Sequence, residues 1–396
     1  MNAAVTTSLF FVFLFLKVDC LKLEEVFVLS RHNLRTPLTD KLQHVTPYPF
    51  PKWETKAGYL TSKGVLLEGY MGEYFNEWLR KEGLFTNECP SEDSVFFYSN
   101  VKQRTIETAK AFAESAFENC NVSIHFKKNA TVDPVFNPVI TNTSEVFKEL
   151  YTASMQRKLN DLNLKDAYTE LDKIIDIKKS DICQKHSFCD LVNRKDEILY
   201  RPGKEPDIFG PLSIGNSLVD SFLMSYYSGA KTEDIAWGKI TTSEQWRKLL
   251  QITWENQNVR FNHTLASDIV KHMLNFIKNS LLTENTARKL TMLVGHDSNL
   301  NSIMAALKFK KYSLPGQYEI TPIGGKIVFQ KWSDDDKYYF LKVEYVYQSR
   351  DQIRDGSKLS MKDPPQTVLM ELTDCKVNEA GYCPWSCFVD VLKNIN

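Results

Sequence analysis

A short, largely apolar run at residues 25–29 ends abruptly in charge, and this transition constrains the fold more than any other feature of the chain. Arg31 and His32 follow the run almost at once, and Arg35 lies four residues beyond Arg31. A β-rich run that stops at polar residues predicts a buried strand that presents them at its carboxyl end. Open α/β sheets bind their ligands at that end of their strands. The pattern therefore predicts an α/β fold with a binding site at the strand ends.

Two later segments repeat this arrangement. The strand-like run at 95–100 leads through Arg104 into a helical pattern, and the apolar run at 290–295 is followed by His296 and Asp297. Each motif alone is weak evidence, because a lone arginine or a His-Asp pair more often lies on a surface or caps a helix. Three strand ends of this composition together predict that the polar side chains converge on one anion.

The residue types suit a phosphate ester. Arginine presents a planar fork that binds phosphate oxygens in pairs and neutralises their charge. A neutral imidazole is a good nucleophile near or below neutral pH, and a hydrogen bond to one ring nitrogen determines which nitrogen attacks. His32 lies between two arginines and is the candidate nucleophile, while the His296-Asp297 pair offers a group that can protonate the leaving oxygen.

The motif Arg31-His32-Asn33-x-Arg35-x-Pro37, with the distant His296-Asp297, resembles the histidine acid phosphatases, the group that includes phytases and prostatic acid phosphatase. The commonest form of the motif has glycine where this chain has Asn33, and asparagine there is shared by the branch of bacterial-type glucose-1-phosphatases. The resemblance extends over nearly the whole mature chain through the segments 60–64, 133–141, 215–220, 293–299 and 321–330.

This resemblance implies a fold and a role for each site residue. The implied fold is α/β, with a phosphoglycerate-mutase-like central mixed sheet flanked by helices and an inserted, mainly α-helical domain. His32 would become a phosphohistidine, and Asp297 would donate the proton. Glu205 and Leu38 would lie at the rim of the cleft and face the non-phosphate part of the substrate. The implied phosphate pocket consists of Arg31, Arg35, Arg104 and His296.

The implied substrates are phosphate monoesters of small sugars, such as glucose 1-phosphate. A carboxylate at Glu205 would accept hydrogen bonds from sugar hydroxyls and repel substrates with several phosphates. The alternative is that Glu205 is a solvated turn residue before Pro206. A general phytase or a broad-specificity acid phosphatase is the main alternative function. A phosphoglycerate-mutase-like phosphotransferase and a secreted binding protein without turnover are the others.

The periodicity of apolar residues changes along the chain. Helical patterns cover residues 144–190, 218–227 and 244–259, whereas the runs at 325–332 and 338–347 predict an antiparallel hairpin. Helical segments therefore lie between two parts of the chain that are rich in strands. We expect the following domains: an α/β domain built from 21–142 and 256–396, and a helical domain, 143–255, inserted between them.

The amino-terminal residues predict export. Residues 9–16 form an unbroken apolar run, which is too short for a membrane span of about 20 residues but suits the core of a signal peptide. Small residues allow cleavage near Cys20, although no Lys or Arg precedes the run. We expect residues 1–20 to be a signal peptide and the mature protein to be secreted without a membrane anchor.

Composition excludes several classes of partner. Lys+Arg and Asp+Glu both total 49 in the 396 residues, so the net charge is zero, and no basic tract indicates a nucleic-acid surface. The cysteines and histidines lack the spacing of a metal site, and no cofactor is expected. The expected partner is a small phosphate monoester, and the oligomeric state stays open.

The cysteines and sequons agree with an exported chain. Seven cysteines remain after the leader is removed, and spacing alone does not determine their connectivity. Proximity and the resemblance together favour Cys89–Cys120, Cys183–Cys189 and Cys375–Cys383, with Cys387 left over. Asn-x-Ser/Thr sequons make the following residues candidate glycosylation sites: Asn121, Asn129, Asn142 and Asn262.

Overall fold

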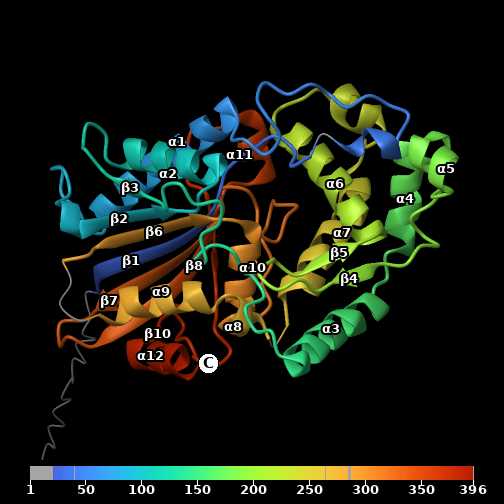
Figure 1. Cartoon of the computed structure of the whole chain (residues 1–396). Helices are drawn as coiled ribbons and strands as arrows, with labels where there is room; N and C mark the ends of the chain where they lie inside the picture. Colours follow the sequence, from blue (N-terminus) through green and yellow to red (C-terminus); the bar gives the residue numbers. More distant parts are fainter. Residues whose placement is uncertain (1–20, 40, 264, 284–286, 396) are drawn as a thin grey trace, which may run out of the picture.

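A mixed sheet of eight strands, which lies on the left in Figure 1, forms the core of one half of the molecule. The computed structural model describes residues 21–395 apart from 40, 264 and 284–286, so the expected signal peptide lies outside the described residues. The strand order is β10-β8-β7-β1-β6-β2-β3, and β9 also pairs with β8. The strands are β1 (Lys22–Arg31), β2 (Val95–Ser99), β3 (Ile124–His125), β6 (Leu290–Gly295), β7 (Lys326–Ser333), β8 (Tyr339–Tyr347), β9 (Gln366–Leu369) and β10 (Cys383–Pro384).

The central strand β1 explains why the first apolar run is continuous. It runs parallel to β6 and antiparallel to β7. Its side chains alternate between the two faces, so Phe27 and Leu29 enter one apolar cluster and Val26 and Val28 enter the other. Because helices cover both faces, both sets of side chains are apolar. The predicted mixed α/β sheet is confirmed, and so is the predicted hairpin, which is formed by β7 and β8.

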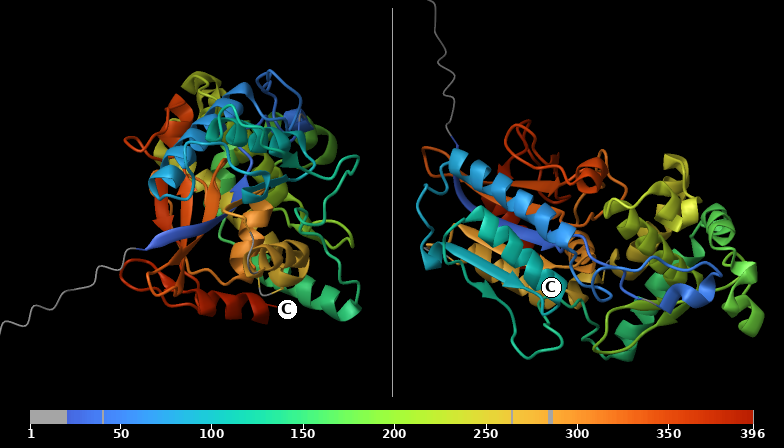
Figure 2. Two further views of the ribbon diagram at one scale, coloured as in Figure 1. Left: turned by 90° about the vertical axis from the view of Figure 1, so that its left-hand side faces the viewer. Right: turned by 90° about the horizontal axis from the view of Figure 1, so that it is seen from above.

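Helices cover both faces of this sheet (Figures 1 and 2). The helices α1 (Ser62–Lys81) and α2 (Gln103–Ala116) pack together on one face, and α9 (Lys271–Leu282), α10 (Asp297–Ala306) and α12 (Trp385–Asn394) lie on the other. Thr61 caps α1, because its hydroxyl accepts a hydrogen bond from the Gly64 amide at 3.0 Å. The sheet is therefore a buried platform whose strand ends point toward the remaining helices.

The remaining helices lie beside the sheet, beyond the carboxyl end of β1 (Figure 1). The longer ones are α3 (Glu145–Asn160), α4 (Lys165–Ile175), α6 (Pro211–Tyr227) and α7 (Ser243–Phe261), with the short α5 (Asp181–His186) and a small hairpin of β4 (Glu197–Leu199) and β5 (Asp207–Phe209). Two further short helices, α8 (Ala266–Ile269) and α11 (Arg350–Asp355), contact α10 and α6, respectively. The expected boundary after residue 255 falls inside α7. The segment before α1 reaches this region too, because the 3-10 helix η1 (Lys41–Val45) contacts α5.

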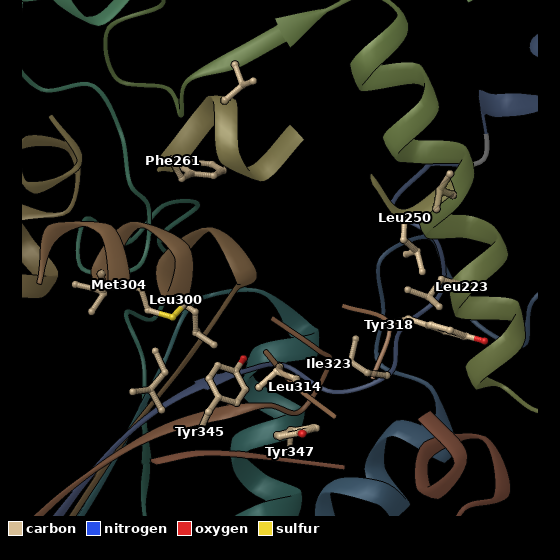
Figure 3. Packing of buried hydrophobic residues seen from close by; sticks show 14 of the residues in the cluster. Leu223, Leu250, Phe261, Leu300, Met304, Leu314, Tyr318, Ile323, Tyr345 and Tyr347 are labelled. Atoms are coloured by element: carbon tan, nitrogen blue, oxygen red, sulfur yellow. The ribbon is translucent and has the colours of Figure 1, made fainter. Parts of the chain in front are cut away.

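Two apolar clusters stabilise the arrangement. One fills the space between the sheet and α1 and α2, and includes Val28, Phe75 and Phe112. The other begins under α10 and continues without a break into the helical part, so that it contains both Leu300 and Leu250 (Figure 3). Burial of apolar surface therefore ties the helical part to the sheet, and the site between them has a rigid frame.

One of the three expected disulfides is wrong. The bonds Cys89–Cys120 and Cys183–Cys189 are present as expected. Cys375, however, bonds Cys387, and Cys383 is a buried free thiol. Cys383 lies in β10, where its side chain enters the core, whereas the start of α12 brings the Cα of Cys387 within 5.9 Å of that of Cys375. Separation along the chain misled the prediction, because a strand and a helical turn decide which thiols meet.

Two surface features bear on the predicted export. Throughout the described ranges, no helix has the length and apolar character needed to cross a membrane. The sequon residues Asn121, Asn129 and Asn262 are exposed, and Asn142 is partly buried. Glycosylation stays a prediction at all four positions.

Candidate active site

The carboxyl ends of β1 and β6 bring two of the predicted motifs together. The two strands are parallel neighbours, and Arg31 lies opposite Gly295 in their register. The His32 amide donates to the Gly295 carbonyl at 3.0 Å, so His32 and His296 leave the sheet side by side. Their ring centroids are 5.5 Å apart. The pairing of β1 with β6 thus brings together two histidines that lie more than 260 residues apart in the sequence.

The third motif reaches the same place through β2. This strand is parallel to β6 on the side away from β1, and the chain turns after Ser99 into α2. Arg104, in the first turn of α2, donates to the Gly58 carbonyl at 3.3 Å, and its Nη2 lies 3.4 Å from Nδ1 of His296. Burial, together with the nearby charge of Arg35, lowers the pKa of Arg104 to about 10.

His32 is buried and held in one orientation. Its Nδ1 lies 2.8 Å from the backbone carbonyl of Asn33, an acceptor, so Nδ1 carries the proton and Nε2 keeps a lone pair. Burial lowers the pKa of His32 well below its usual value, and the charge of Arg104 adds to the effect. The imidazole therefore stays neutral under conditions in which a solvated histidine would be protonated.

His296 is held so that its other ring nitrogen, Nδ1, faces the site. The Asn100 Oδ1 accepts from the Val101 amide at 2.7 Å, which turns the Asn100 amide nitrogen toward Nε2 of His296 at 2.8 Å. Nε2 therefore accepts, and Nδ1 carries the proton on the side of Arg104. Burial lowers the pKa of His296 well below its usual value, with a further contribution from Arg104. Its neutral ring can donate one hydrogen bond into the site.

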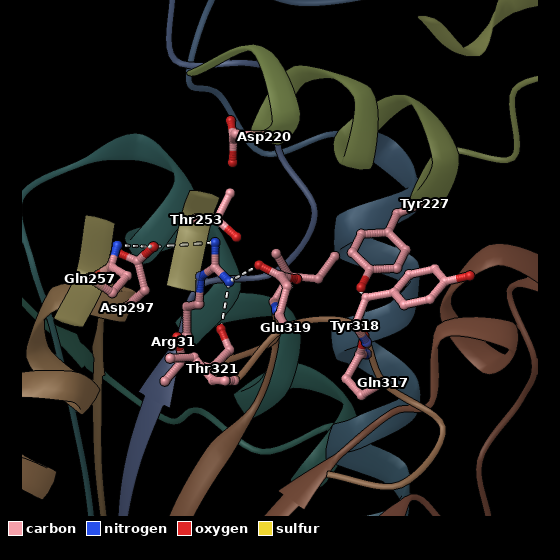
Figure 4. Close-up of polar contacts among 12 residues, drawn as sticks. Arg31, Asp220, Tyr227, Thr253, Gln257, Asp297, Gln317, Tyr318, Glu319 and Thr321 are labelled. Atoms are coloured by element: carbon pink, nitrogen blue, oxygen red, sulfur yellow. Dashed lines mark hydrogen bonds and ion pairs between the residues drawn. The ribbon is translucent and has the colours of Figure 1, made fainter. Parts of the chain in front are cut away.

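Arg31 is fixed by acceptors that the sequence analysis did not identify (Figure 4). Its Nη1 contacts Oε1 of Glu319 and the Thr321 carbonyl, each at 2.5 Å, and its Nη2 lies 3.5 Å from Oδ2 of Asp297. Although burial opposes the charge, the carboxylates of Glu319 and Asp297 raise the pKa of Arg31 above its usual value. The guanidinium is therefore a permanent cation of defined orientation.

Arg35 has a carboxylate partner of its own. Asp220 on α6 accepts two hydrogen bonds from Arg35, at 2.9 and 3.0 Å. The segment 215–220 belongs to the resemblance, but the resemblance implies no role for Asp220. A single acidic residue in a largely apolar helical segment was the only available signal. Glu319 had no comparable signal, because it lies outside any regular element.

All three arginines present an unused donor. The Nε atoms of Arg31, Arg35 and Arg104 are buried, and none has a hydrogen-bond partner within the described part of the chain. A buried donor without a partner costs about 1–3 kcal/mol, so such groups are rare unless they serve a function. Three guanidiniums that line one cavity, each with an unpaired donor, supply the positive charge that a phosphate group requires.

Asp297 begins α10 and faces the arginines. Its Oδ1 accepts from the Ser298 amide at 2.8 Å, and its Oδ2 accepts from the Gln257 amide group at 3.3 Å. Burial raises the pKa of Asp297, but the charges of Arg31 and other neighbouring cations outweigh this effect and leave the pKa below its usual value. The carboxyl group therefore has a protonation state that depends on the charge beside it.

These side chains line a cavity of about 310 Å³ between the sheet and the helical part. The predicted rim residues Glu205 and Leu38 both line it, and Leu38 is 57% exposed. Glu205 is not a free turn residue, because its Oε2 lies 3.4 Å from Nη2 of Arg260. Burial raises the pKa of Glu205, while Arg260 lowers it and so limits the shift.

The structure thus brings every predicted catalytic, phosphate-binding and specificity residue to one cavity, and it adds Glu319, Asp220 and Asn100 as their supports. Within the residues that the structure describes, no group of three or more His, Cys, Asp or Glu side chains is placed to hold a metal ion. At the strand ends the cavity presents two neutral imidazoles, three guanidiniums and the carboxyl group of Asp297, and the carboxylates of Glu205, Asp220 and Glu319 also line it.

Several known proteins are similar to this chain in sequence and in fold. The glucose-1-phosphatase of Providencia rettgeri is 45% identical over 379 residues, 93% of this chain and 91% of that protein. That of Salmonella typhimurium is 41% identical, covering 94% and 92%. The solved phytase from Citrobacter braakii matches with a TM-score of 0.82 at 30% identity, covering 95% and 98%. The family model of the histidine phosphatase superfamily, branch 2, matches residues 22–347. The chain is therefore a phosphatase, and it belongs to branch 2 of the histidine phosphatase superfamily.

Proposed function

We propose that this phosphatase hydrolyses phosphate monoesters of small sugars, such as glucose 1-phosphate, through a phosphohistidine at His32. The observation that carries the proposal is the set of three buried, unpaired guanidinium Nε–H groups beside an imidazole whose Nε2 keeps a lone pair. The first part would bind the phosphoryl oxygens and the second would attack phosphorus. The two glucose-1-phosphatase relatives support the choice of a sugar ester.

The first step forms a covalent intermediate. Arg31, Arg35 and Arg104 neutralise the phosphoryl oxygens, and His296 donates a further hydrogen bond through Nδ1. Nε2 of His32 attacks phosphorus, and the bond from phosphorus to the ester oxygen breaks. That oxygen leaves with the bonding electrons and takes the proton of the Asp297 carboxyl group. The products are the free alcohol and a phosphohistidine.

The second step reverses the roles around the same phosphorus. A water molecule attacks the phosphohistidine, and the Asp297 carboxylate accepts its proton. The nitrogen–phosphorus bond breaks, so that neutral His32 and inorganic phosphate are released and Asp297 is protonated again. One group thus serves as acid and then as base, which requires only that its pKa follow the charge of the site.

The charges around Asp297 link its pKa to the binding of the phosphate group. With no anion bound, Arg31 and its neighbouring cations lower the pKa of Asp297. A phosphate dianion among the arginines offsets their charge and therefore raises the pKa of the same carboxyl group. Binding of the substrate thus favours the protonated, proton-donating form of Asp297, and acid conditions favour it further.

The size and charge of the cavity favour a small substrate. At about 310 Å³ it is at the lower end of the roughly 300–1,000 Å³ typical of small-molecule sites. Glu205 at the rim would accept hydrogen bonds from sugar hydroxyls and disfavour a second phosphate. Its pairing with Arg260 weakens that repulsion, so a polyphosphate such as phytate would be cleaved slowly rather than excluded.

Trapping of the intermediate tests the mechanism. Enzyme quenched in the presence of labelled substrate should carry label in an acid-labile, base-stable linkage, and His32→Ala should carry none. His272→Ala, at an exposed histidine on α9, is the matched control and should label like the wild type. Label that persists in His32→Ala would exclude His32 as the nucleophile. Substrate binding without turnover in the wild type would favour a binding protein.

Comparison of substrates tests the specificity. We expect a higher kcat/KM for glucose 1-phosphate than for phytate, with inorganic phosphate released into water. Faster removal of several phosphates from phytate would instead identify a general phytase. Transfer of the phosphoryl group to an added alcohol in place of water would identify a phosphotransferase.

Export is part of the same proposal. The three disulfides and the exposed sequons support a route through an oxidising compartment. We propose that residues 1–20 are removed as a signal peptide and that the mature protein is secreted. Amino-terminal sequencing of the protein from culture medium should begin near Leu21, and retention of the leader in an intracellular product would contradict the proposal.

A further inference from the structure

Three fully buried polar side chains form one hydrogen-bonded network next to the predicted nucleophile, His32. Lys326 on β7 and Glu68 on α1 form an ion pair at 2.7 Å, and the side chains of both are completely shielded from solvent. The second Glu68 oxygen accepts from the Asn33 amide group at 2.8 Å. Asn33 is the residue that follows His32. The network therefore connects β7, through α1, to the residue that follows His32.

Every hydrogen-bonding group of the charged pair is satisfied. The Lys326 ammonium has three donors, which contact Oε1 of Glu68, the Ser30 hydroxyl at 3.1 Å and the Gly324 carbonyl at 2.9 Å. Gly324 leaves space for this network, because a Cβ at this position would lie 2.5 Å from the Asn33 side-chain amide nitrogen. The close packing thus restricts the arrangement of these side chains.

The network ends at the peptide group that orients the imidazole of His32. The peptide between Asn33 and Leu34 offers one carbonyl and one amide. Its carbonyl accepts the Nδ1 proton of His32 at 2.8 Å, and its amide donates to the Asn33 side-chain oxygen at 2.8 Å. Because Glu68 holds the other end of that side chain, the plane of the peptide cannot rotate freely. The network therefore fixes the direction of the Asn33 carbonyl and, with it, the tautomer of His32.

Stability alone does not account for this pair. Desolvation of a buried ion pair usually costs about as much as the attraction returns, and well-packed apolar residues at such positions are often neutral or stabilising. Most of the space between α1, α2 and the sheet is filled by an apolar cluster. A satisfied lysine–glutamate pair in that cluster contributes most where it fixes one geometry.

We infer that Asn33, Glu68 and Lys326 are positioning residues, which hold the imidazole of His32 with Nε2 unprotonated and aimed at phosphorus. The inference rests on the proposed role of His32 as nucleophile. None of the three side chains lines the substrate cavity, so they act through His32 and not on the phosphate. Their loss should slow the chemical step and leave anion binding by the arginines unchanged.

Kinetic measurements on Asn33→Gly test this separation. The variant keeps the backbone and removes the side chain that ties the peptide to Glu68. We expect kcat for p-nitrophenyl phosphate to fall about tenfold to 10²-fold, as for a misplaced reacting group, while the inhibition constant of inorganic phosphate stays unchanged. The double variant Glu68→Leu/Lys326→Leu removes both charges together and should show the same split between kcat and phosphate affinity.

A matched control separates positioning from general stability. Gln330 lies on the same strand and the same face as Lys326, is buried, and donates to Glu344 at 2.7 Å. Gln330→Leu should lower the melting temperature without a change in kcat. If Asn33→Gly is folded and its kcat equals that of the wild type, or if kcat and phosphate affinity fall together as they would from loss of folding, the inference is wrong.

Nitrogen NMR of the imidazoles gives a readout independent of turnover. In ¹⁵N-histidine-labelled enzyme, the His32 signals are identified by their loss in His32→Ala. They should show a protonated Nδ1 and an unprotonated Nε2 in the wild type, and averaged tautomers in Asn33→Gly. Wild-type signals in Asn33→Gly would overturn the inference. Failure of the phosphohistidine mechanism would appear separately, as label retained by His32→Ala.

Discussion

Arg35 and Asp220 meet through two parallel hydrogen bonds, from Nη2 to Oδ1 at 2.9 Å and from Nη1 to Oδ2 at 3.0 Å. Arg35 follows β1 and Asp220 belongs to α6, so the pair joins the sheet to the helical part across the cavity. The two contacts occupy the terminal nitrogens and leave Nε unpaired among the described residues. Asp220 thus determines which edge of the guanidinium is available to an anion.

Asp220→Ala should weaken catalysis on all phosphate monoesters alike. Without its carboxylate, Arg35 loses the orientation that presents its Nε edge, and we expect kcat/KM to fall roughly tenfold to 10²-fold. The measurement compares glucose 1-phosphate with p-nitrophenyl phosphate. Glu73→Ala, which removes a surface ion pair with Lys358, should have little effect. Unchanged kcat/KM in Asp220→Ala would show that Arg35 is oriented without it.

Asp297→Asn and Arg104→Ala should fail on different substrates. General acid catalysis supplies about 10²–10⁴-fold where a proton must be delivered, so Asp297→Asn should strongly reduce hydrolysis of glucose 1-phosphate and spare p-nitrophenyl phosphate, whose leaving group is good. Arg104→Ala removes charge stabilisation that every ester needs, so both rates should fall. Steady-state kinetics on the two substrates decide the matter, and equal losses in all four combinations would contradict this division of roles.

His263 should make the protein less stable as the pH falls. It is buried beside the Tyr151 hydroxyl, at 2.8 Å, and burial lowers its pKa to about 4. An unfolded histidine has a pKa of about 6.5. Between these values the unfolded chain binds one more proton than the folded chain, so this residue lowers the free energy of unfolding by about 1.4 kcal/mol for each unit that the pH falls.

The variant His263→Gln cannot take up that proton. Urea unfolding at several pH values between 4 and 6.5 should therefore show a shallower loss of stability in His263→Gln than in the wild type. His272→Gln, at an exposed position, serves as the control and should follow the wild-type slope. Parallel slopes for His263→Gln and the wild type would mean that His263 is not neutral in the folded protein at these pH values.

Glu205→Ala should relax the choice of substrate. The change removes the rim carboxylate and frees Arg260, whose charge would then attract a second phosphate group. We expect activity on phytate to rise relative to activity on glucose 1-phosphate. Glu197→Ala, at an exposed position on β4, should leave the ratio of the two kcat/KM values unchanged. A ratio that is also unchanged in Glu205→Ala would assign the selectivity to other residues of the cavity.

The sequence by itself determined the strand ends and their chemistry. An apolar run followed at once by Arg31 and His32, or by His296 and Asp297, is a contiguous signal, because a strand buried on both faces must be apolar until it leaves the sheet. The hairpin of β7 and β8 and the helical segments were predictable for the same reason, since their periodicities are local. The residues that carry these signals could therefore be named before their positions in space were known.

The tertiary structure alone decided what supports those residues. Glu319 lies 288 residues from Arg31 and Asp220 lies 185 from Arg35, and a lone carboxylate has no local pattern that distinguishes it from a solvated surface charge. The same holds for Glu68 and Lys326, which resemble ordinary helix and strand charges until α1 packs on the sheet. Cys383 and Cys387 exchanged roles because β10 buries the first thiol and the start of α12 brings the second to Cys375. Contacts between distant residues depend on how whole elements pack, and that information is spread over the entire core.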